Sequence, residues 1–284
     1  MNKVSVIIPT IGESFLKQTI NCILEGTVVP DEILIVIPHE YNEKLKNIKF
    51  DQRVKILFSE KASQVYQRIL GFNNASFDLV LQLDADILLD NNCIEELISA
   101  IKARDDICVS PRYKSDRNYK LTFIKKFFFK KFIEREKNFA YWDTWFSRNY
   151  FNFNDKLLKT KWLAGGCILH RKKNLILENY YNYEGKAYDE DLIHSFILSK
   201  KKIDLFVTKS YLANSINPET YEHKNLNGLI NYIKRIFIIK KKLANDSDGK
   251  LVYFVFWYFI WVIAEFQRFF KIKIFQQLRV LHFL

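Results

Sequence analysis

The chain has 284 residues, of which 49% are hydrophobic and 16% aromatic, so it is not a disordered chain and has enough apolar surface for a large core. With only 8 Gly and 5 Pro, collagen-like and Gly/Pro-rich low-complexity classes are excluded as well. The formal net charge is +12, and the stretch from residue 224 onward carries eleven Lys and Arg against three acidic residues. The basic character therefore belongs mainly to the C-terminal part, where it predicts an anionic partner.

Short apolar runs alternate with amphipathic segments through the first 110 residues. The runs are apolar on both faces, which is typical of strands in a parallel sheet that is covered by helices on each side. This half is therefore expected to be an α/β unit of the nucleotide-binding type. The expected strands cover 3–9, 31–38, 54–58 and 78–83, and the expected helices cover 13–24, 62–74 and 92–102.

The cysteines and the start of the chain favour an intracellular protein. No two of the four cysteines have the spacing of a zinc knuckle or a redox pair, so we expect them to be reduced (Cys22, Cys93, Cys108, Cys167). The first residues lead directly into a strand, and this predicts that there is no signal peptide.

Two carboxylates, Asp84 and Asp86, directly follow the expected strand 78–83. Ligands of open α/β sheets bind at the carboxyl ends of the strands. A pair of carboxylates at that edge suits a hard divalent cation, which in turn would neutralise a diphosphate. Alone, an Asp-x-Asp motif also arises by chance in solvated loops, so its position after a buried strand is what favours a site.

Two further motifs lie in the second half of the chain. Asp189, Glu190 and Asp191 precede an apolar helix, and three acids exceed what a helix N-cap requires, which favours base chemistry over capping alone. Gly165 and Gly166 lie among apolar residues, and this pattern indicates either a close backbone approach to a ligand or a strand bend.

Together these motifs follow an order found in a known family. Along the chain come a strand ending in Ile8-Pro9-Thr10, a helix with Gln67-Arg68, the Asp84-Ala-Asp86 motif, the glycine pair, and Glu190-Asp191 before a helix. In this order, over about residues 2–205, the chain resembles glycosyltransferase family 2. The resemblance implies a GT-A fold, an α/β Rossmann-like and mostly parallel sheet flanked by helices, here with a basic, aromatic C-terminal helical extension. It divides the chain into a nucleotide-sugar-binding half (1–110), an acceptor-binding and catalytic half (111–222) and the extension (223–284).

The resemblance also implies roles for individual residues. Members are inverting transferases that use a nucleotide-diphospho-sugar and Mg²⁺ or Mn²⁺. The matching positions for the nucleotide sugar are Pro9, Thr10, Glu13, Arg68 and Asp84. Those for the cation are Asp86, Asp84 and, as a late contact, His223, for which an ordinary surface histidine is the alternative. Asp191 matches the general base with Glu190 as its neighbour, and Gly165 and Gly166 match the acceptor-side turn.

The segment 251–264 is an unbroken run of 14 apolar residues, rich in aromatic side chains and flanked by basic ones that include Lys240, Lys241 and Lys242. A spanning helix needs about 20 apolar residues, so we expect an interfacial helix on an anionic leaflet. A helix that caps the core, or one that forms a dimer interface, is the alternative.

The expected function is therefore transfer of a sugar from a nucleotide-diphospho-sugar, with a UDP-sugar expected, to a hydroxyl of a glycan or lipid-linked glycan. Surface polysaccharide or lipooligosaccharide assembly in bacteria, on the cytoplasmic face of the cell membrane, fits the family and the basic tail. The alternatives are a sugar-nucleotidyltransferase and a non-enzymatic basic membrane-binding module. A nucleic-acid partner is not expected, because Lys outnumbers Arg and alternates with Phe.

Overall fold

The computed structural model of the protein describes residues 3–114, 155–183, 187–217 and 225–246, and the backbone at 139–140 and 147–148. It also describes helical positions 255, 258–259, 261–263, 265–267 and 269–270. The chain divides into two compact units. One consists of Met1–Phe139 and Arg148–Ile216, the other of Ala140–Ser147 and Asn217–Leu284.

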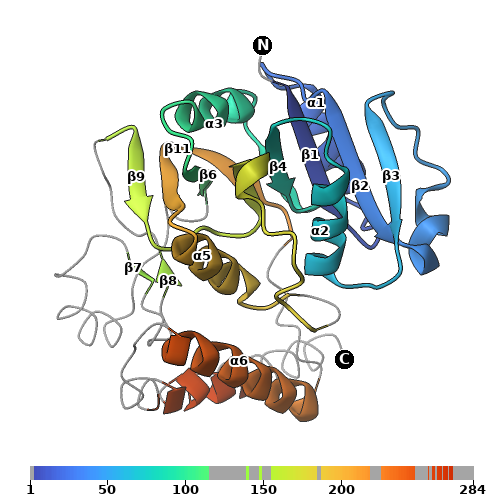
Figure 1. Ribbon diagram of the computed structural model, residues 1–284. Helices are drawn as coiled ribbons and strands as arrows, with labels where there is room; N and C mark the ends of the chain where they lie inside the picture. Colours follow the sequence, from blue (N-terminus) through green and yellow to red (C-terminus); the bar gives the residue numbers. More distant parts are fainter. Residues whose placement is uncertain are drawn as a thin grey trace, which may run out of the picture. The chain divides into compact units, whose positions relative to one another are not determined.

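The first half of the sheet is parallel, as the alternation of strands and helices predicts. The strands β3 (Val54–Ser59), β2 (Glu32–Pro38), β1 (Val4–Pro9) and β4 (Leu79–Leu83) lie side by side in that order (Figure 1). Every residue of β1, β2 and β4 is buried, because helices cover both faces of this part of the sheet. The carboxyl ends of these strands therefore share one edge.

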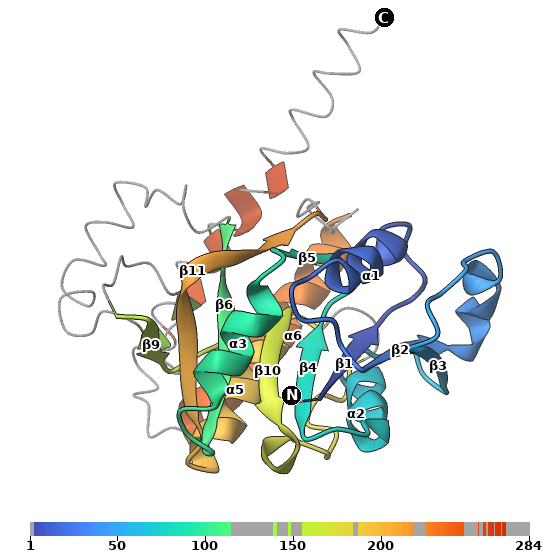
Figure 2. The same cartoon turned by 90° about the horizontal axis from the view of Figure 1, so that it is seen from above.

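The second half of the sheet is mixed in direction. Strand β10 (Cys167–Arg171) is antiparallel to both of its neighbours, β4 and β6 (Ile107–Tyr113). Strand β11 (Asp204–Ser215) is parallel to β6 and antiparallel to β5 (Ile87–Leu89) and β9 (Leu157–Thr160); Figure 2 shows it running along β6 to reach β5. A separate two-stranded sheet pairs β7 (Phe139–Ala140) with β8 (Ser147–Arg148).

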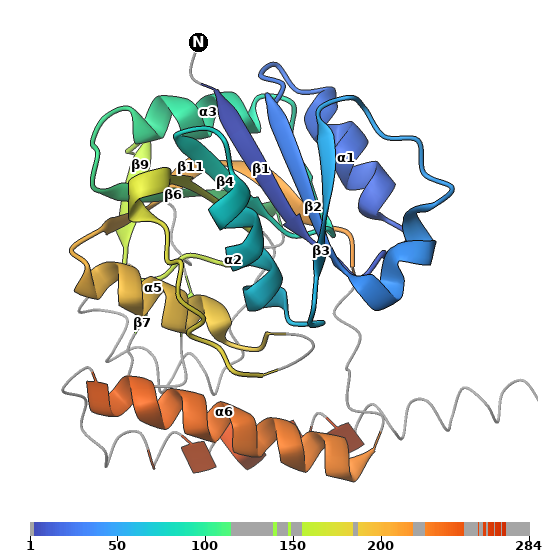
Figure 3. The same cartoon turned by 45° about the vertical axis from the view of Figure 1, so that its right-hand side comes forward.

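In the described part of the chain, helices α1 (Leu16–Leu24), α2 (Gln64–Asn74), α3 (Cys93–Ile101) and α5 (Glu190–Lys200) cover the two faces of the sheet (Figure 3). Helices α1 and α3 pack into the larger apolar cluster on one face, together with β1, β2 and β4. Helix α2 covers the opposite face at β1 and β2, and α5 covers it at β6, β10 and β11. The 3₁₀ helices η1 (His39–Leu45) and η3 (Lys172–Asn174) are short connections.

The second unit is built on α6 (Leu226–Asp246), whose first turn is closed by the Asn225 side chain accepting the Gly228 N–H over 2.8 Å. Leu229 and Ile233 of α6 and Phe269 form its buried cluster. Aromatic side chains from the helical positions after residue 254 pack around this cluster. None of the helices in the described part of the chain has the length and apolar character needed to cross a membrane.

One expectation for this unit is wrong. Lys240 is buried, whereas Lys241 and Lys242 are exposed. Lys240 lies four residues after Ile236 and three before Leu243, both of which are buried, so helical periodicity turns it toward the apolar face. It therefore belongs to the packed side of α6 rather than to a surface for anionic lipids.

Candidate functional site

The Asp84-Ala-Asp86 motif follows β4 directly and is anchored through its backbone. The Asp84 N–H donates to the Gly166 carbonyl over 2.8 Å, and the Ala85 carbonyl accepts the Thr19 hydroxyl over 2.6 Å. Ala85 is buried, whereas Asp84 and Asp86 are partly accessible. The two carboxylates therefore lie at the carboxyl edge of the parallel strands, where ligands of α/β sheets bind.

The guanidinium of Arg68, which is fully buried, joins this motif to the start of α5. Its Nη2 lies 3.1 Å from Asp84 Oδ1 and its Nη1 lies 2.7 Å from Glu190 Oε1. Burial raises the pKa of the Asp84 carboxyl to about 6; the Arg68 charge opposes this rise, and the Asp86 charge adds to it. The buried guanidinium and its two carboxylate partners stabilise one another. Removing one of them would leave an unpaired charge in the interior and lower the free energy of unfolding.

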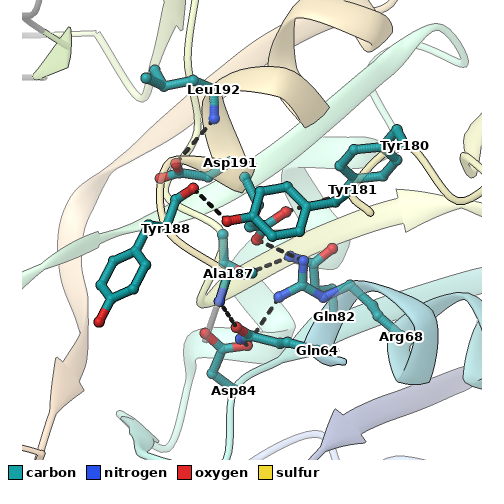
Figure 4. A network of polar contacts seen from close by, with 12 residues as sticks. Gln64, Arg68, Gln82, Asp84, Tyr180, Tyr181, Ala187, Tyr188, Asp191 and Leu192 are labelled. Atoms are coloured by element: carbon teal, nitrogen blue, oxygen red, sulfur yellow. Dashed lines mark hydrogen bonds and ion pairs between the residues drawn. The ribbon is translucent and has the colours of Figure 1, made fainter. Parts of the chain in front are cut away.

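Gln64 makes a second connection, one helical turn before Arg68 on α2. Its Nε2 donates to Asp84 Oδ1 over 3.0 Å, and its Oε1 accepts the Ala187 N–H over 3.4 Å. Figure 4 shows Gln64 and Arg68 next to each other, with Asp84 on one side of them. Two side chains of one helix face therefore contact both the end of β4 and the segment that leads into α5.

The three acids at the start of α5 have different environments. Asp189 adopts the left-handed conformation, with φ 52° and ψ 19°. Glu190 is buried, and its Oε2 accepts the Tyr180 hydroxyl over 2.9 Å while Oε1 pairs with Arg68. Asp191 is partly accessible, and its Oδ1 accepts the adjacent Leu192 N–H over 3.0 Å. Of the adjacent Glu190 and Asp191, the second is therefore the one able to meet a substrate hydroxyl.

Close packing surrounds the glycine pair, against Glu190 at Gly165 and against Tyr113 at Gly166. A Cβ on Gly165 would lie 2.6 Å from Glu190 Oε1, and a Cβ on Gly166 would lie 2.8 Å from the Tyr113 hydroxyl. The Gly165 carbonyl also accepts the Gln82 side-chain amide. Close backbone approach thus explains both glycines, and it brings the turn before β10 against Glu190 and Asp84.

The predicted nucleotide-contacting loop follows β1 at the same edge of the sheet. The Thr10 hydroxyl donates to the Glu13 carboxylate, and Gly12, with φ 75°, donates its N–H to Thr10 Oγ1 over 2.9 Å. The buried Gln67 amide donates to the Thr10 carbonyl over 2.8 Å and to the Val36 carbonyl over 2.7 Å. Thr10 and Glu13 are therefore fixed to each other, and α2 holds their loop in place.

Most of the predicted site residues thus gather at one edge. Pro9 ends β1 and precedes the Thr10 loop, and Arg68, Asp84, Glu190 and Gly165 are in direct contact or joined through one residue. His223, the predicted late metal contact, lies outside the described residues.

The carboxylate pair is suited to a divalent cation shared with a substrate. Among the described residues, no group of three or more His, Cys, Asp and Glu side chains is arranged to hold a metal alone. Mg²⁺ is commonly held by one or two carboxylates together with substrate phosphates and water. Asp84 and Asp86 supply oxygen ligands of this kind and number, so the residues fit such an ion.

Three polar residues that build the site were not predicted from the sequence: Gln64, Gln82 and Tyr180. Gln67 belongs to the Gln67-Arg68 motif, but no role was predicted for it. Two of the three had a readable signal. Gln64 lies four residues before Arg68 and therefore shares its helix face. Gln82 is a polar residue inside an otherwise apolar five-residue strand. No sequence pattern pointed to Tyr180, because it contacts Glu190 from a loop, and a loop has no helical or strand periodicity.

Behind Arg68 lies a pair of buried histidines, His170 on β10 and His194 on α5, with ring centroids 5.4 Å apart. The His170 Nδ1 is 3.2 Å from the Cys108 Sγ, whereas neither ring nitrogen of His194 has a hydrogen-bond partner in the described structure. Burial, helped by the Arg68 charge, lowers the pKa of His194 to about 3. Both rings are therefore neutral and belong to the wall of the site rather than to its proton chemistry.

Comparisons with known proteins agree with this arrangement. Over 119 residues the chain is 34% identical to a dolichol-phosphate mannosyltransferase of Pyrococcus furiosus, a match to 39% of this chain and 33% of the relative. The chain thus matches about a third of that relative's length.

Two solved structures share the fold. S. aureus TarS 1-349 in complex with UDP-GlcNAc aligns with a TM-score of 0.56 and 13% identity, covering 89% of this chain and 69% of TarS. GalNAc-T7 with UDP, GalNAc and Mn²⁺ aligns with a TM-score of 0.52 and 15% identity, covering 88% of this chain and 53% of GalNAc-T7. At these identities the likeness establishes the fold alone.

The family model "Glycosyl transferase family 2" matches residues 5–173, more than half of the chain. This match spans the Thr10 loop, Arg68, the Asp84-Ala-Asp86 motif and the glycine pair. The chain therefore belongs to glycosyl transferase family 2.

Proposed function

We propose that the chain is a metal-dependent inverting glycosyltransferase. It would move a sugar from a nucleotide-diphospho-sugar to a hydroxyl of a glycan or lipid-linked glycan. The observation that carries the proposal is the connection of two carboxylate motifs through one helix. Arg68 and Gln64 of α2 contact Asp84 on one side and the segment before Asp191 on the other. A donor-side acid and an acceptor-side acid are thereby fixed at one edge of the sheet.

In the proposed reaction, the three aspartates have separate roles in metal binding and proton transfer. Asp84 and Asp86 would hold the divalent cation, which would supply positive charge to the donor diphosphate when bound. Asp191 takes the proton from the acceptor hydroxyl, and that oxygen forms a bond to the anomeric carbon. The bond from the anomeric carbon to the diphosphate oxygen breaks, and the nucleoside diphosphate departs. Attack from the face opposite the leaving group inverts the configuration.

The similar proteins support the choice of substrates. TarS was solved with UDP-GlcNAc and GalNAc-T7 with UDP, GalNAc and Mn²⁺, which favours a UDP-sugar donor and Mn²⁺ or Mg²⁺. The mannosyltransferase of Pyrococcus furiosus is named for dolichol phosphate, which favours a lipid-linked acceptor. The family match favours glycosyl transfer over the nucleotidyltransferase and non-enzymatic alternatives.

The proposal includes peripheral attachment to the inner face of the cell membrane. Four apolar side chains of the helical C-terminal positions are exposed: Val255, Phe259, Ile263 and Phe270. The first three are spaced by four residues and so share one helix face, away from Trp261 and Phe266, which pack against the α6 cluster. The exposed Lys241 and Lys242 add positive charge to the same unit. These features favour an anionic lipid surface as the partner.

The test is a screen for donor turnover. The chain is incubated with UDP-, GDP-, dTDP- and CMP-sugars in the presence of Mn²⁺, and release of the nucleoside diphosphate (CMP for the CMP-sugars) is measured. We expect one class of donor to be turned over and the reaction to stop with EDTA. Asp86→Asn should remove metal-dependent nucleotide binding, while Asp106→Asn, a change at an exposed acid in an ion pair with Arg104, should not. Nucleotide binding that EDTA leaves unchanged in the wild type would contradict the metal assignment.

A further inference from the structure

The N-terminal half of α2 and its N-cap residue Ser63 contact the segment before α5 at more than one point. The Ser63 hydroxyl donates to the Tyr183 carbonyl over 3.2 Å, and the Gln64 Oε1 accepts the Ala187 N–H over 3.4 Å. One turn later, Arg68 reaches Glu190 over 2.7 Å. The segment that presents Asp191 is therefore held by side chains of a single helix that also approaches the end of β4.

Gln64 differs from Arg68 in its chemistry and its exposure. Arg68 is fully buried and only donates, so it pairs with two carboxylates. Gln64 is partly accessible, and its carboxamide donates to Asp84 Oδ1 with one end and accepts the Ala187 N–H with the other. Because the Gln64 Nε2 is directed at Asp84, the Gln64 Oε1 faces the backbone of the acceptor-side segment at Ala187.

We propose that Gln64 is a positioning residue. It couples the orientation of the Asp84 carboxylate, on the donor side, to the position of the segment that leads to Asp191. The inference rests on the proposed function, because it assumes that a nucleotide sugar and its cation bind at Asp84. When they bind, Asp84 is held in one orientation, and Gln64 then holds the Ala187 N–H in one place. By linkage, an ordered segment before Asp191 in turn favours donor binding.

Three variants of the full chain separate the parts of this contact. Gln64→Met keeps the length of the side chain but removes both hydrogen bonds. Gln64→Glu keeps an acceptor for the Ala187 N–H but places a carboxylate against Asp84. Asn74→Ala is the matched control, because Asn74 is an exposed amide on the same helix whose side chain donates to Leu70 within α2. Thermal unfolding of each variant checks that the fold is retained.

The measurement is hydrogen exchange of the peptide covering residues 187–192, with and without UDP and Mn²⁺. Without nucleotide, we expect Gln64→Met to exchange about fivefold faster than wild type at the Ala187 amide, since one hydrogen bond is lost. With UDP and Mn²⁺, the wild-type segment should become more protected. Both Gln64 variants should bind UDP yet lose most of this added protection, and Asn74→Ala should behave as the wild type.

The two proposals fail in different ways. If UDP and Mn²⁺ do not bind the wild type, the donor assignment fails, and the nucleotide-free exchange of Gln64→Met still decides whether Gln64 holds the segment. If that exchange equals the wild-type rate, the positioning role is overturned. It is also overturned if UDP binds and protects the segment equally in wild type and Gln64→Met. Weaker binding of UDP and Mn²⁺ together with a lower kcat in Gln64→Met, with neither changed in Asn74→Ala, would support it further, because the lost coupling removes the contribution of the ordered segment to donor binding.

Discussion

Two acidic side chains at the site differ in burial and in hydrogen-bond partners, although both are carboxylates. Glu190 and Asp191 are adjacent acids, yet Glu190 is buried against Arg68 and Tyr180 whereas Asp191 is partly accessible. Both carboxylate oxygens of Glu190 already accept from Arg68 or Tyr180, so this side chain is not placed to meet a substrate hydroxyl. The structure therefore separates a structural acid from the acid that we propose as the base.

Asp191→Asn tests this separation. The amide keeps the shape of the side chain but does not take up the acceptor proton, so turnover should fall by roughly 10²–10⁴ while nucleotide affinity stays near the wild-type value. Steady-state kinetics and titration with UDP measure the two quantities. Glu190→Gln should instead lower the free energy of unfolding by about 3–5 kcal/mol, because it leaves the buried Arg68 pair incomplete. A full loss of activity in Glu190→Gln with wild-type stability, beside an active Asp191→Asn, would reverse the two roles.

The buried His194 should make stability depend on pH. Its pKa is about 3 in the folded protein and about 6.5 in the unfolded chain, so below pH 6.5 the unfolded state binds the proton and the folded state does not. The His194 contribution to the free energy of unfolding should therefore fall as the pH drops from 6.5 toward 3, by up to about 1.4 kcal/mol per pH unit. Asp84, whose pKa is raised to about 6, acts in the opposite direction.

Comparing variants isolates the His194 contribution to this dependence. Between pH 5 and 7, the free energy of unfolding measured in urea should rise less steeply with pH in His194→Leu than in wild type, or fall, because the variant loses the His194 contribution and keeps the opposing Asp84 contribution. His39→Gln, at an exposed histidine, should leave the wild-type slope unchanged. Equal slopes for wild type and His194→Leu would mean that His194 does not stay neutral in the folded protein.

At the scale of single elements, α5 is bounded by two left-handed residues that are not glycine. Asp189 precedes it with φ 52°, and Lys202 follows it with φ 61°. At the C-terminal end the Ile203 N–H donates to the Leu198 carbonyl over 3.0 Å and the Lys202 N–H to the Ser199 carbonyl over 2.9 Å, which is the Schellman pattern. Glycine is the residue that this position normally favours.

Replacing Lys202 by glycine should therefore stabilise the protein. A side chain in the left-handed region costs about 1 kcal/mol, and Lys202 is exposed, so Lys202→Gly should raise the free energy of unfolding by about 0.5–1 kcal/mol. Lys202→Ala serves as the control, since it removes the charge and keeps the Cβ. Urea denaturation midpoints measure the difference. A gain in Lys202→Ala as large as that in Lys202→Gly would point to charge rather than backbone strain.

At the scale of the whole molecule, the chain combines a unit that carries the candidate site with a unit that exposes apolar surface. In the second unit Phe259 and Ile263 are 61% and 59% exposed, while Phe269 is 5% exposed within the same helical stretch. Burying two such side chains in a lipid interface contributes several kcal/mol at about 25 cal/mol per Å². The basic residues would add an attraction that salt weakens.

Attachment to vesicles tests the role of this surface. Full-length protein should sediment with anionic vesicles, and high ionic strength should weaken this binding without abolishing it, because salt screens only the charge contribution. The double variant Phe259→Ser and Ile263→Ser should remain in the supernatant. Leu177→Ser, at an exposed leucine of the first unit, is the matched control. If the double variant still sediments with vesicles, the face that carries Phe259 and Ile263 is not the membrane-binding surface.

The parallel half of the sheet, and the edge at which the candidate site residues lie, could be predicted from the sequence. The predominantly apolar runs in 31–38 and 78–83 are short and rich in Ile, Leu and Val, which favours buried strands, and a carboxylate pair directly after such a strand lies at its carboxyl end. These are local properties of the chain. By contrast, β6 and β11 were not predicted, because polar residues interrupt their apolar character and their burial comes from pairing partners far along the chain.

The burial of Glu190 and the partial accessibility of Asp191 became visible only in the folded chain. The Arg68–Glu190 ion pair joins residues 122 positions apart, and Gln64 meets Ala187 across 123 positions. Spacing along the chain does not specify such contacts, because they depend on how α2 and α5 pack on one face of the sheet. The burial of Lys240 has the same origin. Charge and composition placed it at a surface, but the periodicity of α6 and its packing turned it inward.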